Sequence, residues 1–394
     1  MVPVHPIADD QRRTRLARRH ALAEPVDSVE AAVSAMTCLH ATEPASVHLS
    51  AFARCGASVD AIERALYDDR TVVKQLAMRR TVFAFPRELL PAVWGSAAAR
   101  VAVQQRAQLA RDVVKAQIAT DGPAWVETVT GEVLAMLHER GPMTTMELRA
   151  ALPALDQRLV VSPGKTYGGE FPIASRVLTT LASSGSVLRG DNAGGWKTSR
   201  PRWVKTADWV DVGPALPEAD GYAALVRSWL QTFGPGTEAD IVWWLGATKA
   251  AVRRALADVE AVEVRLEGGT GWVLPDDVDD ADDADQPAPW AALLPALDPT
   301  VMGWKERAFY LGDHAERLFD RNGNGGPTAW WDGRIVGGWT QREDGTVVVV
   351  PAERLDAAAT RALAAEAQSL TDWLAGDVVK SIYQSPLVRA ASAT

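Results

Sequence analysis

The sequence EFPIASRVLTTLASSG (170–185), followed directly by SVLRGDNAGGWKTSRPRWV (186–204), decides the fold of this chain. The first stretch has the apolar spacing of an amphipathic helix and ends on a glycine. The second has two strand-like halves around the Asp-, Asn- and Gly-containing segment 191–195, which predicts a β-hairpin. Just upstream, residues 123–140 and the Thr-capped TTMELRAALP (144–153) predict two further helices. Three helices followed by a hairpin make a winged-helix module.

The same order of elements recurs on both sides of this module. Downstream, three helices and a glycine-turn hairpin are predicted in GYAALVRSWLQTFG (221–234), TEADIVWWLG (237–246), TKAAVRRALADV (248–259) and EAVEVRLEGGTGWVLP (260–275). Upstream, capped helical segments end in TVVKQLAMRRTVFAFP (71–86), a predicted strand pair closed by Pro86, and a helical connector follows to about residue 119. Repetition on this scale indicates tandem modules.

The last hundred or so residues have a different pattern. Strands are predicted around the hairpin turns Asp332-Gly333 and Asp344-Gly345, and an Ala-rich helix follows from about Asp356 to Gly376. The predicted fold is therefore mainly α with β-hairpin wings, that is, three tandem winged-helix modules plus a small C-terminal α+β domain. The predicted domains are residues 1–120 (module 1 with its connector helix), 121–212 (module 2), 213–285 (module 3 with an acidic linker) and 286–394 (the C-terminal domain).

Composition limits the classes of function. The 394 residues carry a formal charge of -9, but seven aspartates lie in DDVDDADDAD (276–285), so a basic surface can exist elsewhere. No apolar run is long enough to span a bilayer, and the charged N-terminal stretch does not have the pattern of a signal peptide. We therefore expect a cytoplasmic protein with no membrane partner, in which Cys38 and Cys55 are reduced thiols.

Three familiar motifs are incomplete in this sequence. DRNGNG (320–325) begins like a calcium loop, but Trp331 stands where the twelfth-position Glu is required, so we interpret it as a turn. SPGKT (162–166) lacks the first glycine of a phosphate-binding loop, because position 159 is Leu. The six histidines show no metal-ligand spacing, so no metal is expected.

Winged-helix modules bind DNA through one helix and the hairpin. In the hairpin 186–204, cations alternate with Trp196 and Trp203, so phosphates can be neutralised and bases can stack. Alternatively, both tryptophans anchor the hairpin in the core and the charges only solvate it. The candidate DNA-binding residues are Arg79, Arg80, Arg189, Lys197, Arg200 and Arg202.

Five strings carry a family resemblance: CLHATEPASVHLSAFAR (38–54), QLAMRRTVFAFP (75–86), YGGEF with its following helix (167–185), LLPALDPTVMGWKER (293–307) and LFDRNGNGGPTAWWDGRIVGGW (318–339). They resemble the AlkZ/YcaQ-like winged-helix family, which includes DNA glycosylases that confer resistance to alkylating or crosslinking natural products. The resemblance covers nearly the whole chain. It implies three tandem winged-helix modules around a DNA channel, a role in DNA repair and antibiotic self-resistance, and no metal or cofactor.

The resemblance also indicates a catalytic segment. The family's motif is Gln, an apolar residue, then Gln or Asp, and the matching positions here are His40, Ala41 and Thr42, so both polar positions differ. A neutral His40 can hold or deprotonate water, Thr42 can orient it weakly, and Glu43 can supply a carboxylate. In the alternative interpretation these residues only form a helix end, where Thr42 or Glu43 caps the helix that starts at Pro44.

Two functions follow from these observations. The first is a monofunctional DNA glycosylase that hydrolyses the N-glycosidic bond of N7-alkylpurine nucleotides in double-stranded DNA, acting as a monomer. The alternative is a non-catalytic winged-helix DNA-binding regulator or lesion sensor, suggested by the changed motif at His40 and Thr42. A third function, suggested by the acidic charge, is that of a structural or partner-binding protein that has lost its affinity for DNA.

Overall fold

The computed structural model describes residues 5–161, 169–278 and 287–392. Phosphate-loop-like SPGKT (162–166) and most of the acidic run 276–285 lie outside these residues. The chain groups into two compact units, of which unit 1 contains Met1–Ala65 and Tyr222–Thr394 and unit 2 contains Leu66–Gly221. The boundary between residues 65 and 66 lies inside the predicted domain 1–120, and the division into four domains stays a prediction.

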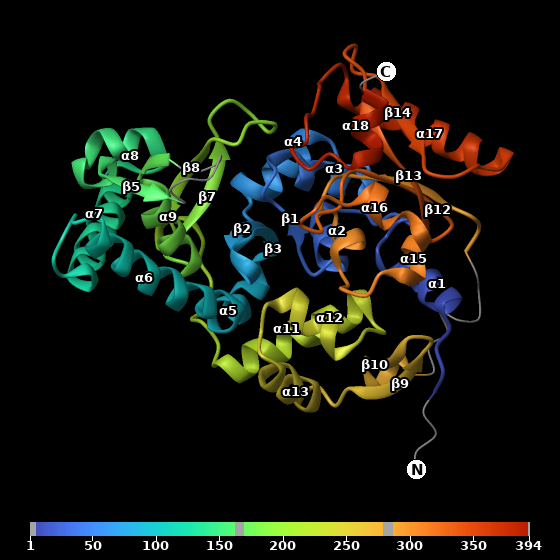
Figure 1. Ribbon diagram of the computed structural model, residues 1–394, viewed down its shortest axis with the longest axis horizontal. Coiled ribbons are helices and arrows are strands. Elements are labelled where there is room, and N and C mark those ends of the chain that lie inside the picture. Colours follow the sequence, from blue (N-terminus) through green and yellow to red (C-terminus); the bar gives the residue numbers. More distant parts are fainter. Residues whose placement is uncertain (1–4, 162–168, 279–286, 393–394) are drawn as a thin grey trace. The chain divides into compact units, whose positions relative to one another are not determined.

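Unit 2 contains residues 121–212, which were predicted to form the second module (Figure 1). Its helices are α5 (Leu90–Gly95), α6 (Ala97–Lys115), α7 (Gly122–Arg140), α8 (Thr145–Ala151) and α9 (Ala174–Ser183). Its strands are β2 (Val72–Leu76), β3 (Val82–Pro86), β4 (Met143–Thr144), β7 (Val187–Asn192) and β8 (Pro201–Lys205). The strands β4, β8 and β7 form one antiparallel sheet, so the predicted helices and hairpin of residues 122–205 are confirmed.

Local sequence explains where these elements begin. Thr144 accepts a hydrogen bond from the Glu147 backbone while the Glu147 carboxylate accepts one from the Thr144 backbone, so α8 starts with a capping box. One expectation was wrong in detail. The segment 170–172 does not begin a helix but lies in β6 (Gly169–Pro172), which pairs with β5 (Arg158–Val161), and α9 starts only at Ala174. Pro172 favours an extended residue before it, which explains the later helix start.

Unit 1 joins the N-terminal helices to the last 170 or so residues (Figure 1). Its N-terminal elements are α1 (Asp9–Arg19), α2 (Val29–Ala35), β1 (Leu39–His40), α3 (Pro44–Cys55) and α4 (Val59–Glu63). Three helices follow, α11 (Glu218–Phe233), α12 (Glu238–Leu245) and α13 (Lys249–Asp258). They lead into the hairpin of β9 (Val262–Leu266) and β10 (Gly269–Val273), which is the order that the repeat predicted.

The C-terminal part of unit 1 is built on a four-stranded antiparallel sheet of order β11-β12-β13-β14. These strands comprise Ala291–Leu294, Thr328–Trp331, Arg334–Gln341 and Val347–Pro351. Asp332 and Gly333 both have positive φ, 47° and 77°, which is the backbone that a tight Asp-Gly hairpin turn requires. Helix α17 (Ala357–Leu374) packs against β11 and β14, and α18 (Pro386–Ser392) against β13 (Figure 1). The predicted α+β arrangement of these residues is confirmed.

A buried ion pair connects the two chain segments that make up unit 1. Arg54 on α3 and Asp298 before α14 (Pro299–Met302) are both fully buried, and their shortest contact is 2.8 Å. Ser50 Oγ also donates to Asp298 at 2.6 Å. Burial alone would raise the pKa of Asp298, but Arg54 and the donated hydrogen bonds together lower it below its usual value. The carboxylate therefore stays charged inside the core.

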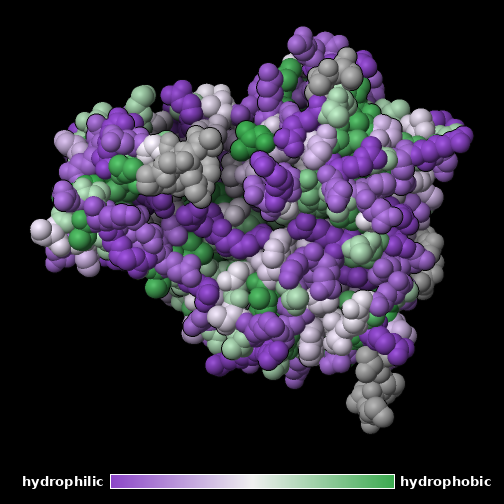
Figure 2. Space-filling model, viewed as in Figure 1, coloured by the Kyte–Doolittle hydropathy of each residue, from purple (hydrophilic) through white to green (hydrophobic). Residues whose placement is uncertain are grey.

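Polar side chains dominate the face shown in Figure 2, and apolar residues appear there mostly as small separate areas. Within the described residues, no helix combines the length and apolar character needed to cross a membrane.

Candidate catalytic site and nucleic-acid contacts

The catalytic segment suggested by the family resemblance lies in unit 1, where β1 ends and α3 begins. His40 is the last residue of β1, residues 41–43 form the connection, and Pro44 occupies the first turn of α3, where its fixed φ suits a helix. His40 and Ala41 are buried, with 9% and 4% of their surfaces exposed, while Thr42 and Glu43 are partly exposed. Access to this segment is therefore through Thr42 and Glu43.

The orientation of His40 limits its chemistry. Its Nδ1 accepts a long hydrogen bond, 3.4 Å, from the backbone N–H of Thr42. A neutral imidazole that accepts at Nδ1 carries its proton on Nε2. In this tautomer Nε2 of His40 is a donor, so His40 cannot accept a proton at that atom.

Glu43 occupies the N-cap position of α3 but does not act as a cap, and neither does Thr42. The Glu43 side chain makes no cap hydrogen bond, so the expectation that Thr42 or Glu43 caps this helix was wrong. Instead its two carboxylate oxygens accept hydrogen bonds from Ser381 Oγ at 2.8 Å and from the Ile382 backbone N–H at 2.6 Å. The competing donors are distant in sequence, which explains why a local capping rule failed.

Burial and hydrogen bonding act in opposite directions on Glu43. Burial raises the pKa of its carboxyl, the bonds from Ile382 and Ser381 lower it, and the net result is a pKa above the usual value. Each carboxylate oxygen has two lone pairs, so one on each oxygen remains for a water molecule. Glu43 is thus a partly exposed carboxylate of increased basicity.

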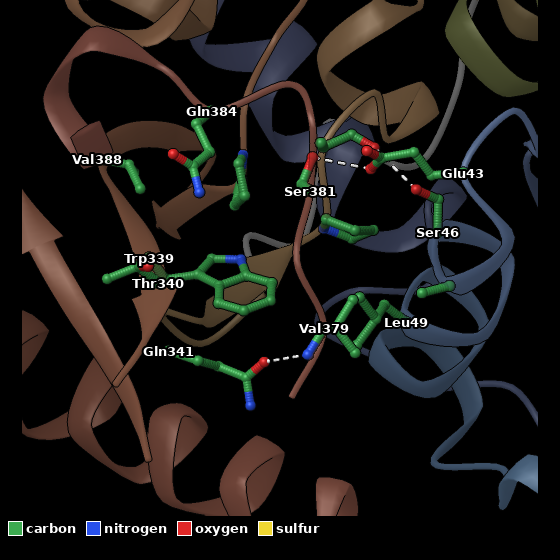
Figure 3. Close-up of a pocket in the computed structure, with 14 residues that line it drawn as sticks. Glu43, Ser46, Leu49, Trp339, Thr340, Gln341, Val379, Ser381, Gln384 and Val388 are labelled. Atoms are coloured by element: carbon green, nitrogen blue, oxygen red, sulfur yellow. Dashed lines mark hydrogen bonds between the residues drawn. The ribbon is translucent and has the colours of Figure 1, made fainter. Parts of the chain in front are cut away.

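A small cavity opens beside this carboxylate (Figure 3). Glu43, Ser46 and Leu49 line it on the α3 side, with Trp339, Gln341 and Gln384 among the residues opposite. The Gln341 amide is fully engaged, because Nε2 donates to the carbonyls of Gly345 and Asp377 and Oε1 accepts from Val379 N–H. The cavity wall is therefore held firmly on the β13 side.

The candidate DNA-binding residues all lie in unit 2. Arg79 and Arg80 lie in the turn between β2 and β3. Both are exposed, and their φ angles of 54° and 60° are in the left-handed region. This conformation is costly for residues with a Cβ, and two such arginines in a row place their charges at the tip of a hairpin.

The hairpin β7–β8 carries the other four candidates, in two kinds of environment. Trp203 is 6% exposed and donates from Nε1 to Thr145 Oγ1 at 3.0 Å, so it anchors the core and is not available to stack on bases. Arg189 lies over the Trp203 ring, 5.4 Å from its centroid, and burial lowers the pKa of Arg189. Arg202 pairs with Asp191 at 2.5 Å.

Lys197 and Arg200 are the exposed cations of the β7–β8 connection. Together with Arg79 and Arg80 they form the exposed part of the predicted DNA-contacting set. Sequence reasoning missed Ser381 and Ile382 as partners of Glu43. No local signal identifies them, since the contacts span 338 and 339 positions.

Comparison with known proteins places the chain in a family. The sequence model described as "DNA glycosylase AlkZ-like" matches residues 33–373, a range that includes the 40–43 segment. The solved structure of Streptomyces sahachiroi DNA glycosylase AlkZ has a similar fold, with a TM-score of 0.72 and 22% sequence identity, covering 95% of this chain and 98% of that one. No curated protein sequence matches the chain significantly. The protein belongs to the AlkZ-like DNA glycosylase family.

Proposed function

We propose that this protein is a monofunctional DNA glycosylase that hydrolyses the N-glycosidic bond of alkylated nucleotides, N7-alkylpurines in particular. The observation that carries the proposal is the family match over residues 33–373, because it includes the segment in which Glu43 presents a basic carboxylate. The proposed partner is double-stranded DNA, bound by a monomer in the cytoplasm.

The reaction needs one nucleophile and one group to take up a proton. The bond between C1′ and the base nitrogen breaks, and its electron pair goes to the base. An N7-alkylated purine already carries a positive charge, so it leaves neutral and needs no acid. Water attacks the oxocarbenium-like sugar at C1′ and loses one proton.

Glu43 is the proposed acceptor of that proton. Its remaining lone pairs can align the water, its raised pKa makes it a better base than an ordinary Glu, and its negative charge stabilises the positive sugar. His40 is proposed to position the water beside Glu43, and Thr42 to orient it through its hydroxyl.

Unit 2 is proposed to supply DNA binding. Arg79, Arg80, Lys197 and Arg200 are exposed on hairpin turns or connections, the positions at which winged-helix proteins contact the phosphate backbone. We interpret the repeated helix-and-hairpin order as three tandem winged-helix modules. Self-resistance to an alkylating natural product would be a fitting biological role.

The test uses a duplex containing one N7-methylguanine. Purified protein should generate abasic sites, detected as strand breaks after alkali, faster than spontaneous depurination. His40→Ala should slow release with little loss of DNA affinity. The matched control is His138→Ala, an exposed histidine of unit 2. No release above the spontaneous rate, with this adduct and with bulkier N7 adducts, would defeat the proposal.

The departure from the family motif at His40 and Thr42 favours one other function, a lesion sensor without catalysis. A sensor would bind the same duplex with steep salt dependence and leave every glycosidic bond intact. The abasic-site assay, run beside a gel-shift titration, separates the two functions.

A further inference from the structure

Residues 379–385, here called the strap, join α17 to α18 without forming a helix or a strand. The strap lies beyond residue 373, where the match to the family ends. It carries two exposed side chains, those of Lys380 and Ile382, and the backbone N–H of Ile382 donates to Glu43.

The strap is attached to unit 1 at several points (Figure 3). Val379 N–H donates to Gln341 Oε1 at 2.8 Å, and Ser381 and Ile382 both donate to Glu43. Ser381 Oγ also accepts from Tyr383 N–H at 3.0 Å, which closes a tight turn around Ile382.

The far end of the strap is held by close packing. A Cβ at Gly326 would lie only 2.8 Å from the backbone nitrogen of Ser385, so the strap rests directly on a glycine. The backbone on both sides of Ile382 is therefore fixed, and little conformational freedom remains to be lost when this residue binds something.

Ile382 has an unusual environment. It is 81% exposed, the highest value among the exposed large hydrophobic residues that the structure describes. The other six of these residues, Val103, Val114, Met146, Val160, Phe171 and Leu216, all belong to unit 2. In the described part of unit 1 an exposed large apolar side chain thus occurs at one place, directly beside the candidate catalytic carboxylate.

We propose that Ile382 is an apolar wedge that enters the DNA base stack beside the nucleotide held at Glu43. Apolar side chains that insert between base steps unstack them partly, and the free energy of unstacking is offset by wider protein contact. A fixed isoleucine next to the reacting sugar would open the stack at the damaged base. Lys380, two residues away and exposed, supplies a charge for the adjacent phosphate.

This proposal rests on the proposed glycosylase function, and its test separates the two. The probe is a duplex with N7-methylguanine on a 2′-fluorinated sugar, which resists hydrolysis because fluorine destabilises the oxocarbenium-like state. A neighbouring 2-aminopurine becomes more fluorescent when it is unstacked. Base release is measured in parallel on the same duplex with an ordinary sugar.

Wild-type protein and Ile382→Leu should both increase the fluorescence and release the base. Ile382→Ser should bind with nearly unchanged affinity, lose the fluorescence increase, and release the base about 10- to 100-fold more slowly, as expected when a contribution to unstacking is lost. The matched control is Val103→Ser, which removes a side chain that is 71% exposed on α6 and should change neither readout.

Each outcome has one meaning. If wild-type protein binds without any fluorescence increase, or if Ile382→Ser behaves like wild type, the wedge is overturned whether or not base is released. If fluorescence rises with wild type and not with Ile382→Ser, while no base leaves the ordinary sugar, the wedge stands and the glycosylase proposal fails. Ile382 is exposed, so none of these changes threatens folding.

Discussion

At the scale of single residues, the chemistry depends on how Glu43 is solvated. It is a carboxylate that burial has made more basic and that two donors from the strap hold in place. In the proposed mechanism it must be ionised to accept a proton. The proposed roles of Glu43 in catalysis and in positioning the strap can be separated by conservative substitution.

We expect Glu43→Gln to lower the rate of base release about 10²- to 10⁴-fold, the usual contribution of general acid–base catalysis. A glutamine has nearly the same shape, and its amide can still accept from Ile382 N–H, so the strap should remain in place. Release assays and thermal unfolding of the same preparations measure both effects. Equal rates for Glu43→Gln and wild type would remove Glu43 from the catalytic step.

The raised pKa of Glu43 also predicts opposite effects of pH on activity and stability. Release should decline as pH falls through the Glu43 pKa, because the protonated carboxyl cannot act as a base. Its stability contribution is fully present below the unfolded-state pKa and is lost as pH rises through the folded-state pKa. At neutral pH, Glu43→Gln should therefore melt at the same temperature as wild type or higher. A clearly lower melting temperature would contradict this expectation.

For the buried pair of Arg54 and Asp298, we expect the stability contribution to depend on pH in the direction opposite to that of Glu43. The pKa of Asp298 is lowered, so its contribution is present above the unfolded-state pKa and is lost as pH falls through the folded-state pKa. Arg54→Met leaves a buried carboxylate without its cation and should cost about 3–5 kcal/mol in the free energy of unfolding.

Chemical denaturation of Arg54→Met, Asp298→Leu and the double variant measures this coupling. The double variant should be more stable than the sum of the single effects predicts, because neither charge is then left alone. Strict additivity would show that the two side chains do not depend on each other.

At the scale of secondary-structure elements, the β2–β3 turn combines strain with charge. Arg79 and Arg80 adopt positive φ, a conformation that costs about 1–2 kcal/mol per residue for side chains with a Cβ. A turn that only connected two strands would be served better by glycine. The presence of two arginines there is consistent with the proposed contact to DNA.

We expect Arg80→Gly to raise the free energy of unfolding by about 1 kcal/mol, because glycine adopts positive φ without strain. The same change should weaken DNA binding and reduce the slope of log K against log salt by about 0.9, the value for one lost phosphate contact. Denaturation and salt-dependent binding titrations measure the two effects. The matched control is Lys115→Gln, which removes an exposed charge at the end of α6 and should leave the salt slope unchanged. An unaltered slope for Arg80→Gly would exclude Arg80 from the interface.

At the scale of the whole molecule, the candidate catalytic and DNA-contacting residues belong to different compact units. Unit 2 is one continuous segment, whereas unit 1 combines both ends of the chain. A continuous segment with its own core and sheet has what a domain needs to fold independently.

We therefore expect a fragment of residues 66–217 to fold cooperatively and to bind duplex DNA with salt dependence, but to release no base, since it lacks Glu43. Circular dichroism melts and gel-shift titrations test these expectations. A fragment carrying Arg80→Gly serves as the control for specific binding. If the fragment does not bind at low salt, unit 2 does not contain the DNA-contacting surface.

The sequence by itself determined most of the local structure. The threonine cap at 144 predicted the start of α8, Asp332-Gly333 predicted a hairpin turn, and the helix-and-hairpin repeat predicted the order of elements. These features depend on hydrogen bonds and φ angles within a few residues, so a local pattern contains the necessary information. The candidate triplet at 40–42 was also accessible from sequence, but only through family resemblance.

Only the tertiary structure decided what surrounds that triplet. It placed the Glu43 carboxylate against residues 381 and 382 instead of at the helix cap, and it buried Trp203 in the core. A carboxylate can satisfy its lone pairs with any donor that packing brings near. The choice between a local cap and a donor more than 300 residues away is made by the packing of unit 1 as a whole.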